Sequence, residues 1–298
     1  MNIVVAGASG FVGSALARSL LVEGHRVTGL GTSARHPMES ESGFNWISAD
    51  TIRGGAWQEA VRDADAVVNL TGRTIFKRWT RRYKKVLLDS RVLTTRNIVE
   101  AMRRGGQVLV SASAIGYYGD RGDEALDEMV PPGDDFLADL SVGWEHAALS
   151  AQNQGVRVAV MRFGVVLGNG GGALAQMLPV FRRFAGGPLG SGSQWFSWIH
   201  MTDLLNIVHY LLEDKAAVGV YNAVAPGTIR HKAFVRCLAK ELNRPAVVWT
   251  PAPALRLMLG EMAGVLLGSQ KVHPKRLMDA GFEFRFSDAA SALKDLVN

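Results

Sequence analysis

Three evenly spaced glycines separate a short apolar segment from a helical pattern near the amino end of this chain. The segment NIVVA (2–6) has the apolar, β-branched character of a buried strand, and Gly7, Gly10 and Gly13 follow it. Apolar residues then recur at helical spacing as far as Glu23. A strand, a glycine turn and a helix start form an anion site, because the first N–H groups of the helix point outward and its dipole favours negative charge.

Each glycine of this turn has a separate physical task. Gly7 permits the tight turn, Gly10 lets a pyrophosphate approach the backbone, and Gly13 lets the helix pack closely on the strand. The spacing is G-x-x-G-x-x-G, which differs from the standard G-x-G-x-x-G of dinucleotide sites. The turn therefore predicts a bound dinucleotide, and the alternative is a tight strand–helix turn without a ligand.

The next expected strand indicates which dinucleotide is bound. An NAD site usually has an Asp or Glu about 20 residues after the glycines, which binds the ribose 2′-hydroxyl. Here the segment GLGTSARHP (29–37) has no carboxylate and instead carries Thr32, Ser33 and Arg35. Hydroxyls and a guanidinium suit a 2′-phosphate, so NADP(H) is favoured over NAD(H) as the cofactor. The alternative is that these three residues belong to a solvated loop.

Apolar segments alternate with helical patterns over the first half of the chain. The expected strands lie at 2–6, 25–30, 44–50, 64–72, 107–113, 156–168 and 219–224, and the longer helices at 80–104 and 135–155. This alternation predicts an α/β fold, a Rossmann-like doubly wound parallel sheet of about seven strands. After residue 166 the alternation becomes irregular, which predicts a smaller C-terminal α/β substrate lobe. We expect residues 1–165 plus 199–224 to form the NADP-binding domain, and 166–198 plus 225–298 the substrate-binding lobe.

Composition narrows the class of protein. The single cysteine, Cys237, excludes an intrachain disulfide, and the scattered histidines predict no metal site. Met1 runs almost directly into the first strand, so no signal peptide is expected and a cytoplasmic location is predicted. The most apolar candidate span, 251–268, contains Arg256 and Glu261, so no membrane association is expected.

The net charge of +6 admits an anionic ligand or a weak nucleic-acid contact. The basic segment KRWTRRYKK (77–85) spreads its charges around a helix, which favours a solvated face, and no nucleic-acid module accompanies it. We expect a small-molecule substrate and no nucleic acid, with the chain acting as a monomer or a homodimer.

Several further motifs, taken in order, resemble one protein superfamily. They are NLTG (69–72), SASAIGYYG (111–119), MRFGVVLG (161–168) and SWIHMTDL (197–204). With the glycine turn, they make the chain similar to the short-chain dehydrogenase/reductase superfamily. It is most similar to an atypical epimerase-like subfamily, described as nucleoside-diphosphate-sugar epimerase-like or cell-division-inhibitor-like. The resemblance spans the whole chain and implies NADP binding with a small C-terminal substrate domain.

The resemblance also assigns cofactor contacts to individual positions. It places Thr32 and Arg35 at the adenosine phosphate and Asp50, at the end of the third strand, beside adenine. The remaining matches are the pyrophosphate turn and the segment beside the cofactor ribose: Gly7, Ser9, Gly10, Phe11 and Val12 in the former, and Leu70, Thr71 and Gly72 in the latter.

The catalytic pair of the superfamily is missing. Relatives with standard chemistry use Tyr-x-x-x-Lys, in which the tyrosine moves a proton and the lysine charge lowers its pKa. Counting back from Glu145, where epimerase-type relatives have a Glu eight residues after the Tyr, puts Leu137 and Ser141 at these positions. Ordinary alcohol oxidation by the superfamily mechanism is therefore in doubt.

Other side chains could supply catalysis or bind the substrate. Ser113 matches the active-site Ser/Thr position of the superfamily, and Tyr117 and Tyr118 could supply a phenol, although Tyr118 also suits a packing role. Arg162 could bind a substrate anion or pair internally with a carboxylate. Trp195 and Trp198 could stack on a ring-shaped substrate or pack in the core.

Two functions remain open at this point. One is an NADP-dependent oxidoreductase or epimerase that acts on a small polar substrate, for which a nucleotide sugar is one candidate. The other is a nucleotide-binding sensor or interaction protein that has lost turnover.

Overall fold

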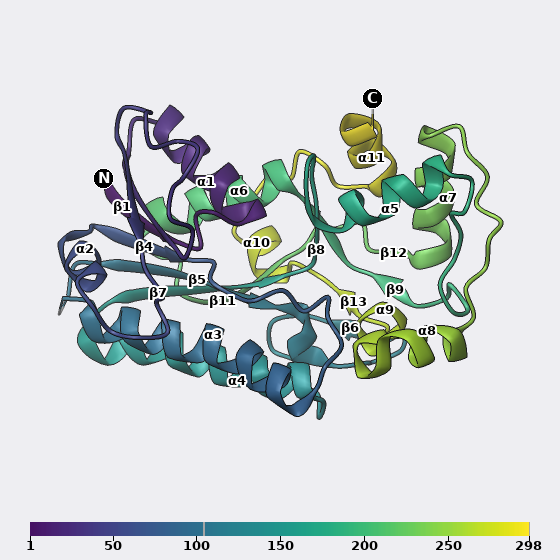
Figure 1. The fold of residues 1–298 in the computed structure, drawn as a ribbon, viewed down its shortest axis with the longest axis horizontal. Coiled ribbons are helices and arrows are strands. Elements are labelled where there is room, and N and C mark those ends of the chain that lie inside the picture. The colour runs from purple at the N-terminus through teal and green to yellow at the C-terminus, as the bar shows by residue number, and fades with distance from the viewer. Residues whose placement is uncertain (104, 298) are drawn as a thin grey trace.

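A seven-stranded parallel sheet forms the centre of the computed structural model, which describes residues 1–103 and 105–297 (Figure 1). Its strand order is β11-β7-β5-β4-β1-β2-β3, and every neighbouring pair is parallel. The strands are β1 (Asn2–Ala6), β2 (Arg26–Gly31), β3 (Phe44–Ser48), β4 (Ala66–Asn69), β5 (Val108–Ala114), β7 (Arg157–Phe163) and β11 (Gly219–Ala223). The predicted doubly wound α/β fold is confirmed, including its seventh strand.

Helices cover both faces of this sheet (Figure 1). One face carries α2, α3 and α4, and the other carries α1 and α6. Their bounds are α1 (Phe11–Val22), α2 (Trp57–Asp63), α3 (Arg81–Ala101), α4 (Phe136–Leu149) and α6 (Met201–Glu213). The helix expected at 80–104 thus ends at Ala101, and position 104 lies outside the described residues.

Alternate residues of β1 explain the two layers. Ile3 and Val5 pack into the core beneath α1 and α6, whereas Val4 and Ala6 pack into the core beneath α2, α3 and α4. A strand that is covered on both faces has no polar side, and successive side chains point to opposite faces. This is why the first strand reads as an unbroken apolar segment.

The expected strand at 156–168 divides into two strands at Gly164. β7 stays in the main sheet, while β8 (Val165–Leu167) pairs in parallel with β10 (Trp198–His200). A Cβ at Gly164 would lie 2.9 Å from the carbonyl oxygen of Ser197, so only glycine allows this close crossing. The chain therefore leaves the main sheet at this point.

The C-terminal part contains short helices and two-residue strands (Figure 1). Their bounds are α5 (Gly172–Arg182), β9 (Trp195–Phe196), β12 (Ile229–Arg230), α7 (His231–Glu241), α8 (Ala252–Leu259), η3 (Gly260–Met262), α9 (Ala263–Leu267), β13 (Lys271–Val272), α10 (Lys275–Asp279) and α11 (Ala289–Val297). β13 pairs with β6 (Ala125–Leu126), which follows the 3₁₀ helix η1 (Ile115–Tyr118), and another 3₁₀ helix, η2 (Ser150–Gln154), follows α4. The division into two lobes at the expected boundaries stays a prediction.

No helix within residues 1–103 and 105–297 combines the length and the apolar character needed to cross a membrane.

Candidate cofactor-binding and active site

The strand order reverses between β1 and β4, and the glycine turn lies at this switch point. Ligands of open α/β sheets bind at the carboxyl ends of the strands where the order reverses. A Cβ on Gly7 would lie 3.0 Å from the carbonyl group of Leu70, so the turn after β1 adjoins the segment after β4. The two predicted cofactor segments, 7–13 and 70–72, are therefore neighbours in the fold.

The turn leaves backbone amides free at the start of α1. Within the described residues the N–H groups of Phe11 and Val12 have no partner, whereas the earlier N–H groups of Gly7, Ala8 and Gly10 bond to backbone carbonyls. Gly7 has φ +84°, which other residues rarely adopt, and a Cβ on Gly13 would lie 2.1 Å from the carbonyl oxygen of Gly7. Gly10 is the N-cap of α1 and no side chain caps the helix. Because Ser9 and Gly10 are exposed, the free N–H groups of the first turn, which begins with Phe11 and Val12, are available to a phosphate.

A second glycine-rich segment packs around the ring of Phe11. A Cβ on Gly171 would lie 2.2 Å from Phe11 Cδ2, and Cβ atoms on Gly168 and Gly172 would lie 2.9 and 2.8 Å from the same ring. The segment 168–172 therefore encloses the first residue of α1 and fixes the position of the pyrophosphate turn.

The proposed phosphate residues after β2 are exposed. Thr32, Ser33 and Arg35 all lie on the surface, and within the described residues Arg35 forms no ion pair. Asp50 is also exposed and lies two residues beyond the end of β3. These side chains are free to contact a ligand.

Residues Ser90 and Arg91 of α3 hold the segment after β4 in place. Ser90 Oγ accepts a hydrogen bond from the Arg73 N–H at 3.2 Å, and Arg91 Nη2 donates to the Arg73 carbonyl at 3.1 Å. The Arg91 guanidinium lies against Gly72, where a Cβ would be 2.8 Å from Arg91 Cζ. The sequence analysis missed this contact, because 18 residues separate Arg91 from Arg73.

Arg91 has no acidic partner among residues 1–103 and 105–297. Its guanidinium lies 5.2 Å from the ring centroid of Trp144, and burial lowers its pKa to about 10. The indole Nε1 of Trp144 and the hydroxyl of Thr71 are buried without a hydrogen-bond partner. A cation and two unsatisfied polar groups thus lie around the carboxyl end of β4, in the region where the cofactor ribose is expected.

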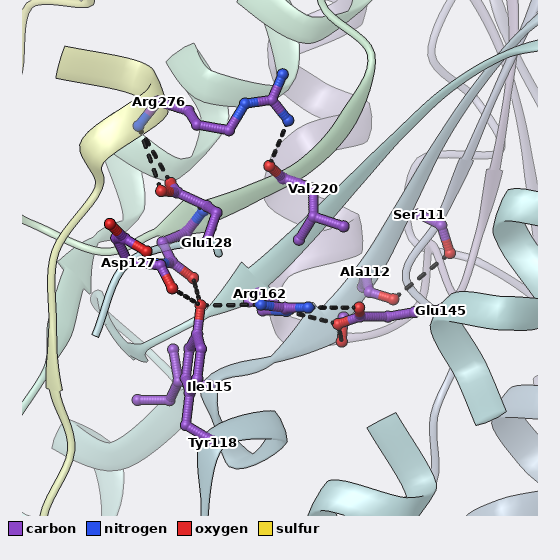
Figure 2. Close-up of polar contacts among 12 residues, drawn as sticks. Ser111, Ala112, Ile115, Tyr118, Asp127, Glu128, Glu145, Arg162, Val220 and Arg276 are labelled. Carbon is purple, nitrogen blue, oxygen red and sulfur yellow. Dashed lines mark hydrogen bonds and ion pairs between the residues drawn. The ribbon is translucent and has the colours of Figure 1, made fainter. Parts of the chain in front are cut away.

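Ser113 hydrogen bonds to Glu145 instead of facing solvent. Its side chain lies at the carboxyl end of β5 and is 2% exposed, and its hydroxyl donates to Glu145 Oε1 at 2.7 Å. Arg162 Nε and Nη2 donate to the two oxygens of Glu145, each at 2.8 Å (Figure 2). This ion pair is almost wholly buried. Burial alone would lower the pKa of Arg162, but hydrogen bonds and charge from Glu145 raise it above its ordinary value.

The prediction that Arg162 contacts the substrate is therefore wrong in this structure, and its internal pairing is the alternative that holds. Arg162 is 3% exposed and its donors are directed at Glu145 and the Tyr118 hydroxyl. β7 is a central strand covered on both faces, so a charged side chain on it needs a buried partner.

Tyr118 belongs to the same buried network. Its single hydroxyl proton has two acceptors within reach, Asn222 Oδ1 at 2.7 Å and the Asp127 carbonyl at 3.0 Å. The hydroxyl oxygen accepts from Arg162 Nη1 at 2.9 Å (Figure 2). The side chain is fully buried, and burial raises its pKa to about 12. Tyr118 is thus a packing residue with a satisfied hydroxyl, and its role as a proton donor is not supported.

Tyr117 differs from its neighbour. It is half-buried, and its ring stacks on the Arg162 guanidinium, with 3.3 Å between Cζ and the ring centroid. The ring meets Tyr118 edge-on at 5.3 Å between centroids. These contacts fix the ring, and within the described residues they leave the Tyr117 hydroxyl without a hydrogen bond.

Leu137 and Ser141, at the positions of the missing pair, are packed into the fold. Leu137 lies against Gly116, where a Cβ would be 3.2 Å from Leu137 Cβ, and Ser141 is 1% exposed. Phe136 meets the Trp79 ring edge-on at 5.3 Å. No proton-transferring group therefore occupies either position of the Tyr-x-x-x-Lys pattern.

The two tryptophans have structural contacts. Trp198 is fully buried and donates to the Gly227 carbonyl at 3.1 Å, so the prediction that it stacks on a substrate is wrong. β10 packs its side chains into the main core, which explains the burial. Trp195 is partly exposed, but Arg230 and Lys271 lie 4.1 and 4.9 Å from its ring, and its Nε1 donates to Asp123.

The segment 197–204 braces the C-terminal part of the chain. Asp203 is fully buried at the start of α6 and accepts the N–H groups of Arg285 and Phe286 at 2.8 and 3.0 Å. His200 lies 3.3 Å from Asp295 of α11. These contacts join the main sheet to the last residues of the chain.

Comparisons with known proteins agree with this architecture. The model of the NAD dependent epimerase/dehydratase family matches residues 3–224, and a domain of unknown function, DUF1731, matches residues 250–296. The chain is 40% identical to the chloroplastic epimerase family protein SDR39U1 homolog of Arabidopsis thaliana, over 100% of this chain and 87% of that protein. It is 36% identical to epimerase family protein SAR0825 of Staphylococcus aureus, over 99% of this chain and 98% of the relative.

Solved structures of similar proteins have the same fold and the same family name. The crystal structure of human epimerase family protein SDR39U1 with NADPH has a TM-score of 0.87 and 33% identity, and covers 100% of this chain and 99% of that one. A nucleoside-diphosphate sugar epimerase from Corynebacterium glutamicum has a TM-score of 0.78 and 32% identity, and covers 100% of this chain and 58% of that one. With the glycine turn at the switch point of a seven-stranded parallel sheet, these matches establish that the chain belongs to the NAD-dependent epimerase/dehydratase family.

Proposed function

We propose that this protein is an NADP(H)-dependent oxidoreductase or epimerase of the short-chain dehydrogenase/reductase type, acting on a small polar substrate. The observation that carries this proposal is the uncapped start of α1, with Gly7, Gly10 and Gly13, lying against the end of β4. The human relative crystallised with NADPH supports the same cofactor here.

The residues of the site fit such a cofactor along its length. The free amides of the glycine turn suit the pyrophosphate, and the exposed Thr32, Ser33 and Arg35 suit a 2′-phosphate. Asp50 would contact adenine. Leu70, Thr71 and Gly72 would line the ribose of the nicotinamide half.

Arg91 would hold the nicotinamide half of the cofactor. Its guanidinium lies against Gly72 and lacks a carboxylate partner among the described residues. A lysine at the position of Ser141 would normally supply the cation near this ribose, and Arg91, from the neighbouring helix, supplies a charge instead. A half-buried cation whose partners are neutral carbonyl groups favours an electron-rich ligand.

Ser113 and Tyr117 are the candidate catalytic residues. The bound cofactor would supply hydride transfer to or from a carbon atom of the substrate. Because Ser113 donates its proton to Glu145, its lone pairs remain free to accept a hydrogen bond from a substrate hydroxyl. The unpaired phenol of Tyr117 would donate a proton to the reacting oxygen, and its stacking on Arg162 orients it.

A second function has its own support. Ser113 is nearly buried, and Leu137 and Ser141 stand where the Tyr-x-x-x-Lys pair would be, which favours an NADP(H)-binding sensor or interaction protein without turnover. Binding and turnover distinguish the two. Titration with NADPH and NADH tests the cofactor, and the absorbance of reduced nicotinamide, followed across a panel of carbonyls and alcohols, tests turnover.

Two variants and two matched controls test the catalytic assignment. Ser113→Ala and Tyr117→Phe should each lower kcat by at least about 100-fold, the usual contribution of a positioned proton-transfer group. Ser111→Ala and Tyr118→Phe alter a neighbouring buried hydroxyl and phenol, and should retain far more activity. Turnover that survives both test substitutions would remove Ser113 and Tyr117 from catalysis. Saturable NADPH binding without turnover on any substrate would favour the sensor.

We propose a cytoplasmic protein that binds a small molecule and no nucleic acid, as a monomer or a homodimer. The name of the Arabidopsis relative assigns that protein to the chloroplast. Fractionation of the native organism and light scattering of the purified protein test these two points.

A further inference from the structure

Four exposed residues after β2 form an arch beside the pyrophosphate turn. We define this arch as residues 32–35, which follow Gly31 and precede the buried His36. The arch contains Thr32, Ser33 and Arg35, the residues proposed to bind a 2′-phosphate. An exposed loop of this kind normally costs conformational entropy when a ligand orders it. The contacts at each part of the arch therefore decide how well it is preorganised.

His36 ties the carboxyl end of the arch to the glycine turn. The imidazole is 6% exposed, and its Nε2 lies 3.3 Å from the carbonyl oxygen of Ala8, a residue of the turn itself. Nδ1 accepts the N–H of Met38 at 3.2 Å, so Nε2 is the nitrogen that donates to Ala8. The ring lies 4.9 Å from the rings of both Phe44 and Trp46. Nε2 thus joins the carboxyl end of the arch to the turn, while the bond from Met38 to Nδ1 fixes the orientation of the ring.

Trp46 holds the middle of the arch from β3. Its Nε1 donates to the carbonyl oxygen of Ser33 at 3.0 Å. The ring also covers Gly31, where a Cβ would lie 2.6 Å from Trp46 Cη2 and 2.9 Å from Ser9 Oγ. The indole therefore fits only if β2 ends in glycine, at a point that also adjoins the turn residue Ser9.

A groove of about 520 Å³ borders the arch, lined by Ala34, Arg35, Glu39, Phe44, Asn45, Trp46 and Ser48. The Glu39 carboxylate that lines this groove accepts the His36 N–H at 2.6 Å. Because the groove is open, the arch depends on the anchors supplied by His36 and Trp46.

We propose that His36 and Trp46 are positioning residues that hold the arch in the conformation that receives a 2′-phosphate, and so set the preference for NADPH over NADH. This inference rests on the proposed function, in which the turn binds the pyrophosphate and Arg35 binds the 2′-phosphate. Neither His36 nor Trp46 needs to touch the cofactor. Because they hold the arch in place beforehand, the arch loses less conformational entropy when the phosphate binds.

The test is the affinity of the full-length protein for four probes: NADPH, NADH, 2′,5′-ADP and 5′-ADP. His36→Phe retains an aromatic ring but loses both hydrogen bonds, and Trp46→Phe loses only the bond to Ser33. Each should raise Kd for NADPH and 2′,5′-ADP by about three- to tenfold, the effect of losing a hydrogen bond of ordinary strength. Kd for NADH and 5′-ADP should change by less than about twofold. A merely structural role would weaken all four probes together.

Three further variants make the result decisive. His36→Gln retains a donor that can reach the Ala8 carbonyl and should recover part of the preference. Trp249→Phe, at an exposed indole of the C-terminal part, is the matched control and should leave all four affinities unchanged. Arg35→Ala should abolish the preference altogether.

The outcomes separate this inference from the function on which it rests. If Arg35→Ala removes the preference while His36→Phe and Trp46→Phe keep the wild-type ratio, the positioning role is wrong and the phosphate assignment stands. If Arg35→Ala leaves the ratio intact, both are wrong. If one variant fails to fold, the other still tests the inference, because each removes a different anchor. If the wild type binds neither dinucleotide, the proposed function itself fails.

Discussion

Glu145 and Arg162 form a buried two-point ion pair that joins α4 to β7 and fixes the hydroxyl of Ser113. The two carboxylate oxygens accept from Arg162 at 2.8 Å, and the exposed fractions of the side chains are 5% and 3%. Such a pair stabilises little compared with apolar packing, but removing one partner leaves an uncompensated buried charge. The pair therefore makes the fold intolerant of single substitutions at either residue.

Glu145→Gln should accordingly lower the free energy of unfolding by about 3–5 kcal/mol, because it leaves the Arg162 charge without its counter-ion. Urea denaturation followed by circular dichroism measures this loss. Asp279→Asn, which breaks the exposed pair with Lys275, is the matched control and should cost less than about 1 kcal/mol. Equal losses from the two substitutions would contradict the role of burial.

Arg91 should contribute to the nicotinamide half of the cofactor and not to the adenosine half. Arg91→Met should raise Kd for NADPH and NADH by about tenfold each, the effect of one charge-assisted hydrogen bond, and leave Kd for 2′,5′-ADP unchanged. Isothermal titration calorimetry measures all three affinities. Arg96→Met, at an exposed arginine of the same helix, should leave them unaltered. A loss of 2′,5′-ADP binding in Arg91→Met would indicate general damage to the fold.

Gly171 should be intolerant of even one methyl group. Gly171→Ala puts a Cβ 2.2 Å from Phe11 Cδ2, and overpacking of this kind costs about 1–3 kcal/mol. Because Phe11 begins α1, the same substitution should also weaken NADPH binding. Thermal unfolding with and without NADPH measures both effects. Gly264→Ala, where nothing lies within 4 Å of the new Cβ, is the control and should leave Tm equal or higher.

Buried histidines should make the fold sensitive to acid. Burial lowers the pKa of His231 to about 4, so the unfolded chain binds more protons than the native chain below about pH 6.5. The stability from this group is fully present above about pH 6.5 and falls by about 3 kcal/mol as the pH drops to about 4. Burial also lowers the pKa values of His200 and His209, which act in the same direction.

His231→Leu isolates this contribution. Its Nδ1 has no hydrogen-bond partner among the described residues, so the apolar side chain loses no bond there. Urea unfolding at about pH 7.5 and about pH 4.5 should show a smaller acid-induced loss in this variant than in the wild type. His146→Leu, at an exposed site on α4, is the control. An identical acid loss in His231→Leu and the wild type would contradict the assignment.

Local patterns were sufficient to predict the nucleotide-binding half of the protein. The apolar character of residues 2–6 reflects a strand covered on both faces. Gly7, Gly10 and Gly13 are required locally, because a Cβ at each position would crowd nearby backbone atoms. The missing Tyr-x-x-x-Lys pair could likewise be read directly, because both positions lie on one helix at a fixed spacing. The parallel pairing of the strands followed from the alternation of strands and helices, since parallel neighbours need a crossover.

Only the tertiary structure decided which polar and aromatic side chains are free to act. Arg162 pairs with Glu145, Trp198 is buried beside Gly227, and Tyr118 bonds to Asn222, 104 positions away in the sequence. Tyr117 has the same residue type and adjacent position, yet its phenol stays unpaired. Sequence periodicity shows which face of a helix or strand is apolar. The hydrogen-bond and packing partners of a side chain depend instead on how segments distant in the sequence meet. Arg91 lies against Gly72, and His36 bonds to Ala8, for this reason.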